Sequence, residues 1–167
     1  MARALILLLF AVPALAAAQP GAHVHGQAKL EVVIDGPLLA IALESPLDGL
    51  VGFEHPPRTA PQKQAAARAL ALLKEPPRLF TLPPEAGCRS EATEVVAPVL
   101  EGQASKDGHG DLDARWTFRC TAPEKLATLE QGLFAAFPRL SRLEVQVAGP
   151  KGQRKQSLKR PERAVRF

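Results

Sequence analysis

The 167-residue chain contains no tyrosine, one tryptophan and one methionine. Proteins that bind nucleic acids along a surface combine basic side chains with aromatic rings on which the bases stack. The chain has no stretch in which basic and aromatic residues alternate, so we do not expect a nucleic-acid partner. The single methionine is Met1, and the mature chain therefore offers no thioether to a soft ion such as Cu(I).

Motifs of covalent catalysis are also missing. The sequence has no nucleophile elbow, no glycine-rich phosphate loop and no zincin helix. We therefore expect a protein that is not an enzyme. One alternative stays open, a metal hydrolase in which Glu54 would stand beside an open coordination position.

No apolar run is long enough to span a membrane, which takes about 18 or more residues. The longest run, Ala4 to Leu15, follows the positive Arg3 and contains Pro13. Small residues follow the run, as at a signal-peptidase site, so this segment resembles a cleaved signal peptide more than a membrane anchor.

The expected organisation follows from that cleavage. Residues 1–18 form the signal peptide, residues 19–26 a flexible N-terminal segment, and residues 27–167 a single domain. The mature protein would be periplasmic and without a transmembrane segment.

The two cysteines, Cys88 and Cys120, allow only one disulfide pairing. An exported protein meets an oxidising compartment, which favours the bridge. The alternatives are two buried thiols or two metal ligands. If the bridge forms, both sulfurs are removed from any metal site.

The alternation of apolar and polar residues predicts an α+β fold. We expect an antiparallel sheet of about six strands and two helices, in the order ββαββαββ, with one disulfide. The first helix would begin near Pro61, after a Thr59 cap, and the second would follow a Thr121 cap. The expected strands lie near residues 28–35, 39–45, 88–100, 112–120 and 143–147, with a sixth in the C-terminal tail.

The positive charge of the chain is concentrated at its C-terminal end. Between Lys151 and Arg166 there are seven basic residues and one acid, so this tail has a net charge of +6. Residues 1–150 have a net charge of −2, and the whole chain has +4. The tail could be a solvated face, or it could contact an acidic partner or an anionic membrane surface. This second reading gives the alternative function, a non-catalytic interaction module.

All four histidines lie in polar segments rich in glycine or proline: His23, His25, His55 and His109. His23 and His25 form a His-x-His pair, whose imidazoles share one face of an extended backbone. Glu54 precedes His55 and adds a carboxylate. Imidazole and carboxylate groups are ligands that Zn²⁺ accepts, so these five residues are our candidate metal ligands.

Several stretches resemble a known family. They are HVHGQAKLEVVIDG, LESPLDGLVGFEHPPRT, the RWTFRC segment with its partner Cys88, GLFAAFP and LEVQVAGPKGQ. Together they are similar to the zinc-regulated periplasmic zinc-binding proteins, the ZrgA-like family. The resemblance implies Zn²⁺ binding in zinc homeostasis or uptake, together with an ABC transporter.

The resemblance also assigns the candidate ligands. His23 and His25 match the leading His-x-His-Gly of the family, and Glu54 and His55 match its Phe-Glu-His. His109 falls where many members carry a long insert rich in His and Asp, of which this chain keeps a single histidine. Because the His-rich insert is reduced to one histidine, we expect less zinc capture by this loop than in the family. The expected site is then on the folded domain and is built from His23, His25 and His55.

Overall fold

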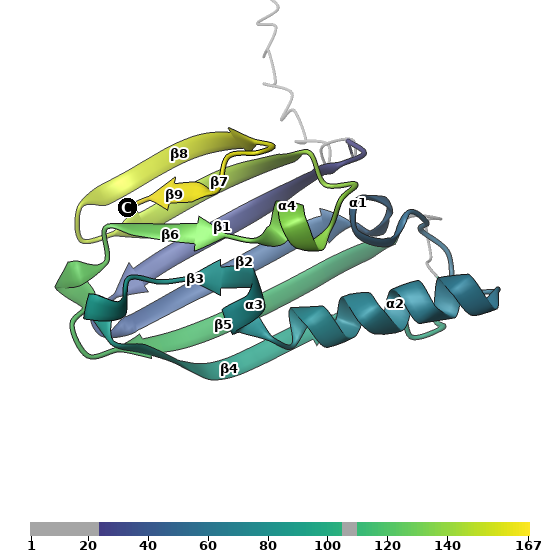
Figure 1. The fold of residues 1–167 in the computed structure, drawn as a ribbon, viewed down its shortest axis with the longest axis horizontal. Helices are drawn as coiled ribbons and strands as arrows, with labels where there is room; N and C mark the ends of the chain where they lie inside the picture. The colour runs from purple at the N-terminus through teal and green to yellow at the C-terminus, as the bar shows by residue number, and fades with distance from the viewer. Residues whose placement is uncertain (1–23, 105–109) are drawn as a thin grey trace, which may run out of the picture.

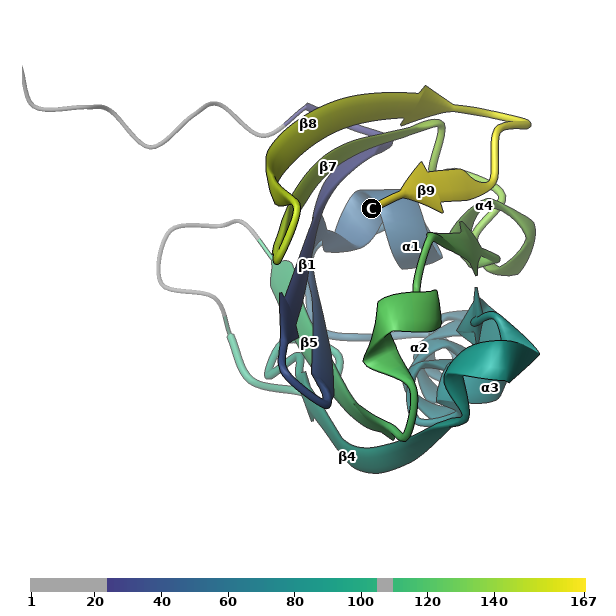
Figure 2. The same cartoon turned by 90° about the vertical axis from the view of Figure 1, so that its left-hand side faces the viewer.

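The computed structural model describes residues 24–104 and 110–167. The predicted signal peptide and His23 lie outside the described residues, as does His109. The described chain folds into a large curved sheet, with helices and a second, small sheet on one of its faces (Figures 1 and 2).

The large sheet has six strands, in the order β4-β5-β2-β1-β7-β8. All six segments in which we predicted strands contribute to it. Their bounds are β1 Gln27–Asp35, β2 Leu38–Pro46, β4 Cys88–Val96, β5 Asp111–Cys120, β7 Arg142–Gly149 and β8 Gly152–Lys159. One pairing differs from the expected antiparallel sheet, because β1 and β7 run parallel at its centre. The sheet is therefore mixed.

The strands form where the sequence alternates most regularly. In β1, Leu30 and Val32 are fully buried, while the alternating Lys29 and Glu31 are exposed. Such alternation fixes the register, because a slip of one residue would turn every apolar side chain to solvent. A hairpin connects β1 and β2, and its Gly36 adopts the positive φ of 52° that favours glycine in tight turns.

The first predicted helix is confirmed as α2, Ala60–Leu73. The Thr59 side chain accepts a hydrogen bond from the Gln62 backbone N–H, and the Gln62 side chain accepts one from that of Thr59. This capping box fixes the start of the helix. Two shorter helices flank α2 in sequence, α1 Leu47–Val51 before it and α3 Pro76–Leu79 after it.

The second predicted helix is wrong. The segment after Thr121 instead forms the 3₁₀ turn η2 Pro123–Lys125, the strand β6 Thr128–Gln131 and the one-turn helix α4 Leu133–Ala136. Its apolar residues are buried as expected, but β6 pairs with β3 (Phe80–Thr81) and β9 (Ala164–Arg166) in a three-stranded sheet. Tertiary pairing thus overrides the helical spacing of the leucines.

The disulfide between Cys88 and Cys120 is confirmed. The β4–β5 register places the two residues directly opposite each other at the end of the strands. The predicted strand over residues 88–100 ends at Val96, and a turn containing Pro98 follows. The short turn η1, Pro84–Ala86, leads into Cys88.

The core lies between the large sheet and the elements on its inner face (Figure 2). Trp116 of β5 is fully buried there, and its indole Nε1–H donates to the Leu73 carbonyl at 2.8 Å. Among the described residues, no helix is both long enough and apolar enough to cross a membrane.

Candidate metal centre

Three segments meet around α1: the one that precedes β1, the loop that follows α1, and the one that precedes β5. They lie at the end of the sheet where β1 and β5 begin and β2 ends (Figure 1). The Leu47 backbone N–H donates to the Gly110 carbonyl at 2.8 Å. A Cβ placed on Gly110 would lie 2.9 Å from the Glu54 carbonyl oxygen, and one on Gly49 would lie 3.7 Å from the Gly26 Cα. These contacts bring the segments of His25 and His55 to the same end of the sheet.

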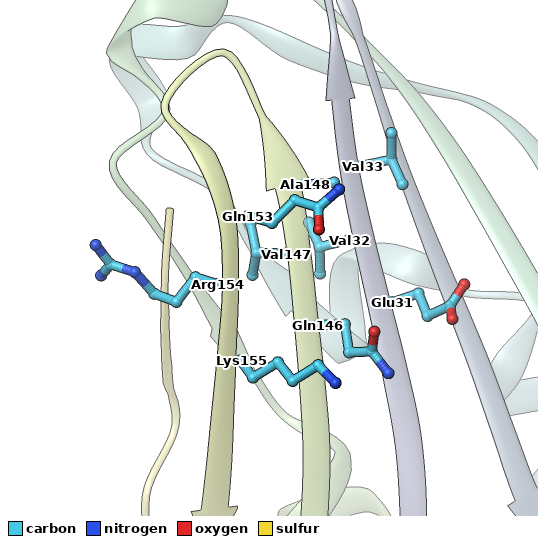
Figure 3. A pocket seen from close by; sticks show the side chains of 9 residues that line it. All are labelled: Glu31, Val32, Val33, Gln146, Val147, Ala148, Gln153, Arg154 and Lys155. Atoms are coloured by element: carbon cyan, nitrogen blue, oxygen red, sulfur yellow. The ribbon is translucent and has the colours of Figure 1, made fainter.

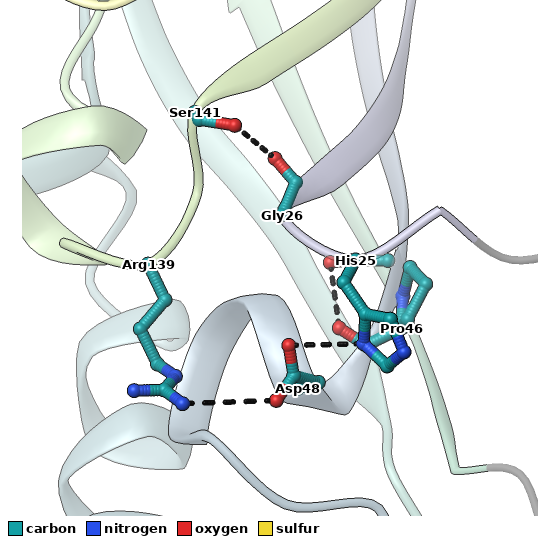
Figure 4. A network of polar contacts seen from close by, with 7 residues as sticks. His25, Gly26, Pro46, Asp48, Arg139 and Ser141 are labelled. Carbon is teal, nitrogen blue, oxygen red and sulfur yellow. Dashed lines mark hydrogen bonds and ion pairs between the residues drawn. The ribbon is translucent and has the colours of Figure 1, made fainter.

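His25 forms a close polar contact with α1. Its Nδ1 lies 3.1 Å from Oδ2 of Asp48, while Oδ1 of the same carboxylate lies 3.8 Å from the Arg139 guanidinium (Figure 4). An ionised carboxylate only accepts hydrogen bonds, so the proton of a neutral His25 lies on Nδ1. The Nε2 atom then keeps its lone pair. The His25 side chain is 75% exposed, so Nε2 can be approached from solvent.

His55 is held in the same tautomer by a different partner. Its Nδ1 lies 2.9 Å from the Pro56 carbonyl oxygen, which can only accept a hydrogen bond. Nε2 again keeps the lone pair. The ring is half-buried and stacks on Phe53, with ring centroids 5.4 Å apart and an interplanar angle of 29°. The stacking limits the rotation of the imidazole.

Glu54 is half-buried between Phe53 and His55, and its backbone lies against Gly110. Cys88 and Cys120 form the disulfide, so neither sulfur is a ligand. Among residues 24–104 and 110–167, no three His, Cys, Asp or Glu side chains lie close enough together to hold a metal ion. His23 and His109 lie outside the described residues, and these candidates stay predictions.

Asp48 is the residue of this region that sequence reasoning missed. It lies in the stretch LESPLDGLVGFEHPPRT, in the first turn of α1, and its side chain is 25% exposed. The available signal was an acidic residue two positions after the end of a strand and seven positions before His55. Its pairing with His25 depends on tertiary structure, which no local pattern encodes.

Further carboxylates lie nearby on the outer face of the sheet. Asp113 of β5 is directly opposite Glu44 of β2, and Asp111 is two residues before it. Partial burial of the Asp113 carboxyl raises its pKa above the ordinary value, and the charges of Glu44 and Asp111 raise it further. Negative charge thus gathers close to the end of the sheet that carries the histidines, which favours the approach of cations.

A family model described as "ZrgA family zinc uptake protein" matches residues 22–167. The chain belongs to the ZrgA family. No curated protein matches it. Membership of the ZrgA family confirms the resemblance inferred from the sequence and indicates a role in zinc uptake.

Proposed function

We propose that the mature protein is a periplasmic, non-enzymatic zinc-binding protein, which buffers Zn²⁺ or delivers it to an ABC transporter. The supporting observation is the surroundings of Nδ1 in the two described histidines. Nδ1 of His25 and Nδ1 of His55 each face an oxygen acceptor, and both residues lie in segments that meet around α1. A metal-bound histidine typically donates its other ring N–H to a carboxylate or a backbone carbonyl, and Nδ1 of each ring here faces one of these two acceptors.

The proposed ligands are Nε2 of His25 and Nε2 of His55, with the Glu54 carboxylate from the loop of His55. These three side chains do not form a three-ligand cluster in the described structure, so zinc binding would have to draw them together. Zinc sites in proteins have about four ligands. The two histidines outside the described residues, His23 and His109, are the candidates for the remaining positions. In this arrangement Asp48 and the Pro56 carbonyl orient the ligands and do not bind the ion.

The donor set favours Zn²⁺ over Cu(I). Imidazole and carboxylate groups bind Zn²⁺ well, whereas Cu(I) prefers thiolates and thioethers. Both cysteine sulfurs are in the disulfide, and the only methionine is Met1 in the predicted signal peptide. Zinc here is cargo, and binding and release are the steps that the protein must perform.

The test is calorimetric titration of Zn²⁺ into the metal-free mature protein and into a His23→Ala/His25→Ala/His55→Ala variant. We expect stoichiometric binding that is lost in the variant. A His109→Ala variant measures the contribution of the remaining histidine. Circular dichroism without zinc checks that each variant folds.

Two results would overturn the proposal. One is weak binding by the unmodified protein. The other is tight binding that the triple substitution leaves unchanged, which would place the zinc elsewhere.

A further inference from the structure

Strand β8 is one edge of the large sheet. It pairs with β7 along its whole length, from Gly149 opposite Gly152 to Arg142 opposite Lys159. On its other side, no strand of the described part of the chain pairs with it. An edge strand presents backbone N–H and C=O groups to which another extended chain can bond.

The basic residues of this region fall into two groups. Arg160 donates to the carbonyls of Phe137, Pro138 and Leu140 and lies over the Phe134 ring, so it stabilises the fold. Arg163 lies 3.7 Å from Glu130. The other five basic side chains are exposed, and none forms an ion pair with another described residue. They are Lys151, Arg154, Lys155, Lys159 and Arg166.

Three of these five residues, Arg154, Lys155 and Lys159, belong to β8, and they lie on both of its faces. Successive side chains of a strand point to opposite faces, so Arg154 and Lys155 extend to opposite sides of β8, as Figure 3 shows. Lys159 shares the face of Lys155. A flat membrane surface would contact one of these faces only. An extended chain beside the edge could contact Lys155 and Lys159 on one face and Arg154 on the other.

Two further structural features involve β8. The Gln156 side chain bonds both to the backbone N–H of Arg166 at 3.1 Å and to its carbonyl at 2.8 Å, which fixes β8 to β9. A cavity of about 400 Å³ adjoins the edge, over β1, β7 and β8, and Val33, Ala148, Gln153 and Lys155 are among its lining residues (Figure 3).

We propose that β8 binds an extended acidic segment of a partner protein, which adds to the sheet as a seventh strand. Its Asp and Glu side chains would pair with Lys155 and Lys159 on one face and with Arg154 on the other. Main-chain hydrogen bonds would supply affinity, and the cations would select for acidic sequence. The surface contains none of the candidate zinc ligands, so this proposal is independent of zinc binding.

The test uses fluorescence anisotropy of a labelled peptide in which glutamate alternates with valine or threonine, added to the mature protein. We expect binding that weakens at high salt. A Lys155→Glu/Lys159→Glu variant should bind the peptide at least about tenfold more weakly, a loss of about 1.4 kcal/mol. Lys63→Glu/Lys74→Glu, which changes the same charge at exposed positions on and just after α2, should bind as the unmodified protein does.

Strand addition is distinguished from charge attraction by N-methylation. Two peptides methylated at alternate backbone nitrogens block opposite edges of the strand, and we expect only one of them to bind. Equal binding of both peptides would contradict strand addition.

Two other results would overturn the proposal as a whole. One is no peptide binding. The other is binding only to phosphatidylglycerol vesicles, which would assign the cations to a membrane surface. Should the double variant not fold by circular dichroism, Arg154→Glu gives the same comparison.

Discussion

Nδ1 of His25 lies 3.1 Å from Oδ2 of Asp48, a contact that joins the segment before β1 to the first turn of α1. The other carboxylate oxygen faces Arg139 at 3.8 Å, so the position of Asp48 is set from two sides. An imidazole that faces a carboxylate through Nδ1 turns Nε2 away from that carboxylate. This pair therefore determines which atom of His25 is available to a metal ion.

Removing the Asp48 carboxylate should weaken zinc binding without removing a ligand. Loss of an outer partner of a ligating histidine typically lowers metal affinity by about 10- to 100-fold. We expect this loss for Asp48→Ala and a smaller one for Asp48→Asn, which retains an acceptor oxygen. Calorimetric titration measures both. Glu124→Ala, an exposed carboxylate on η2, is the control, and a loss no larger than in this control would refute the role of Asp48.

The close approach of Gly110 to the Glu54 backbone gives a second prediction. The Cβ of a Gly110→Ala variant would lie 2.7 Å from Leu47 Cδ1 and 2.9 Å from the Glu54 carbonyl oxygen. The leucine can rotate away, but the backbone must shift. We expect a loss of about 1–3 kcal/mol in the free energy of unfolding, as in other overpacked sites, and weaker zinc binding because His55 follows Glu54. Urea denaturation and zinc titration measure the two effects, and unchanged values would contradict this packing.

The strands could be predicted from the sequence because each has one buried face. In β5, Leu112, Ala114 and Trp116 are buried and alternate with exposed or half-buried residues, so the period of two is visible locally. The helix expected after Thr121 failed for the opposite reason. Leu126, Leu129 and Leu133 are spaced as in a helix and are buried, but Gly132 separates β6 from α4, and β6 pairs with strands distant in sequence.

The candidate site was predictable in its residue types and not in its geometry. His25 and His55 were identified from their polar surroundings, whereas the carboxylate that holds His25 belongs to a segment that is distant in sequence from β1. The parallel pairing of β1 with β7 is likewise non-local. Such relationships depend on how the elements pack, and local periodicity contains no information about them.

The indole hydrogen bond of Trp116 should contribute to stability. In Trp116→Phe the ring is shortened, and the buried Leu73 carbonyl loses the donor that lies at 2.8 Å. Leaving a buried acceptor unsatisfied costs about 1–3 kcal/mol. We expect a decrease of that size in the free energy of unfolding. Because Trp116 is the only tryptophan, denaturation must be followed by circular dichroism and not by fluorescence. A decrease below about 0.5 kcal/mol would show that the bond adds less than a typical buried hydrogen bond.

The raised pKa of Asp113 predicts how stability depends on pH. The fold disfavours the charged carboxylate, because the group is partly buried and lies near Glu44 and Asp111. A pKa that is higher in the folded than in the unfolded state contributes stability at pH values below the unfolded pKa, and this contribution is lost as the pH rises through the folded pKa. At neutral pH the full cost of the charge is present.

Asp113→Asn removes that cost. We expect the variant to be more stable than the unmodified protein at pH 7 by only a few tenths of a kcal/mol, because Asp113 is largely exposed and solvent screens its repulsion with Glu44 and Asp111. The gain should shrink as the pH falls through the raised pKa and vanish near pH 3, where the carboxyl group is protonated in both states. Urea denaturation at both pH values measures the difference, and Glu124→Gln is the control. A gain that is equal at pH 7 and pH 3 would mean that the substitution acts through packing and not through charge.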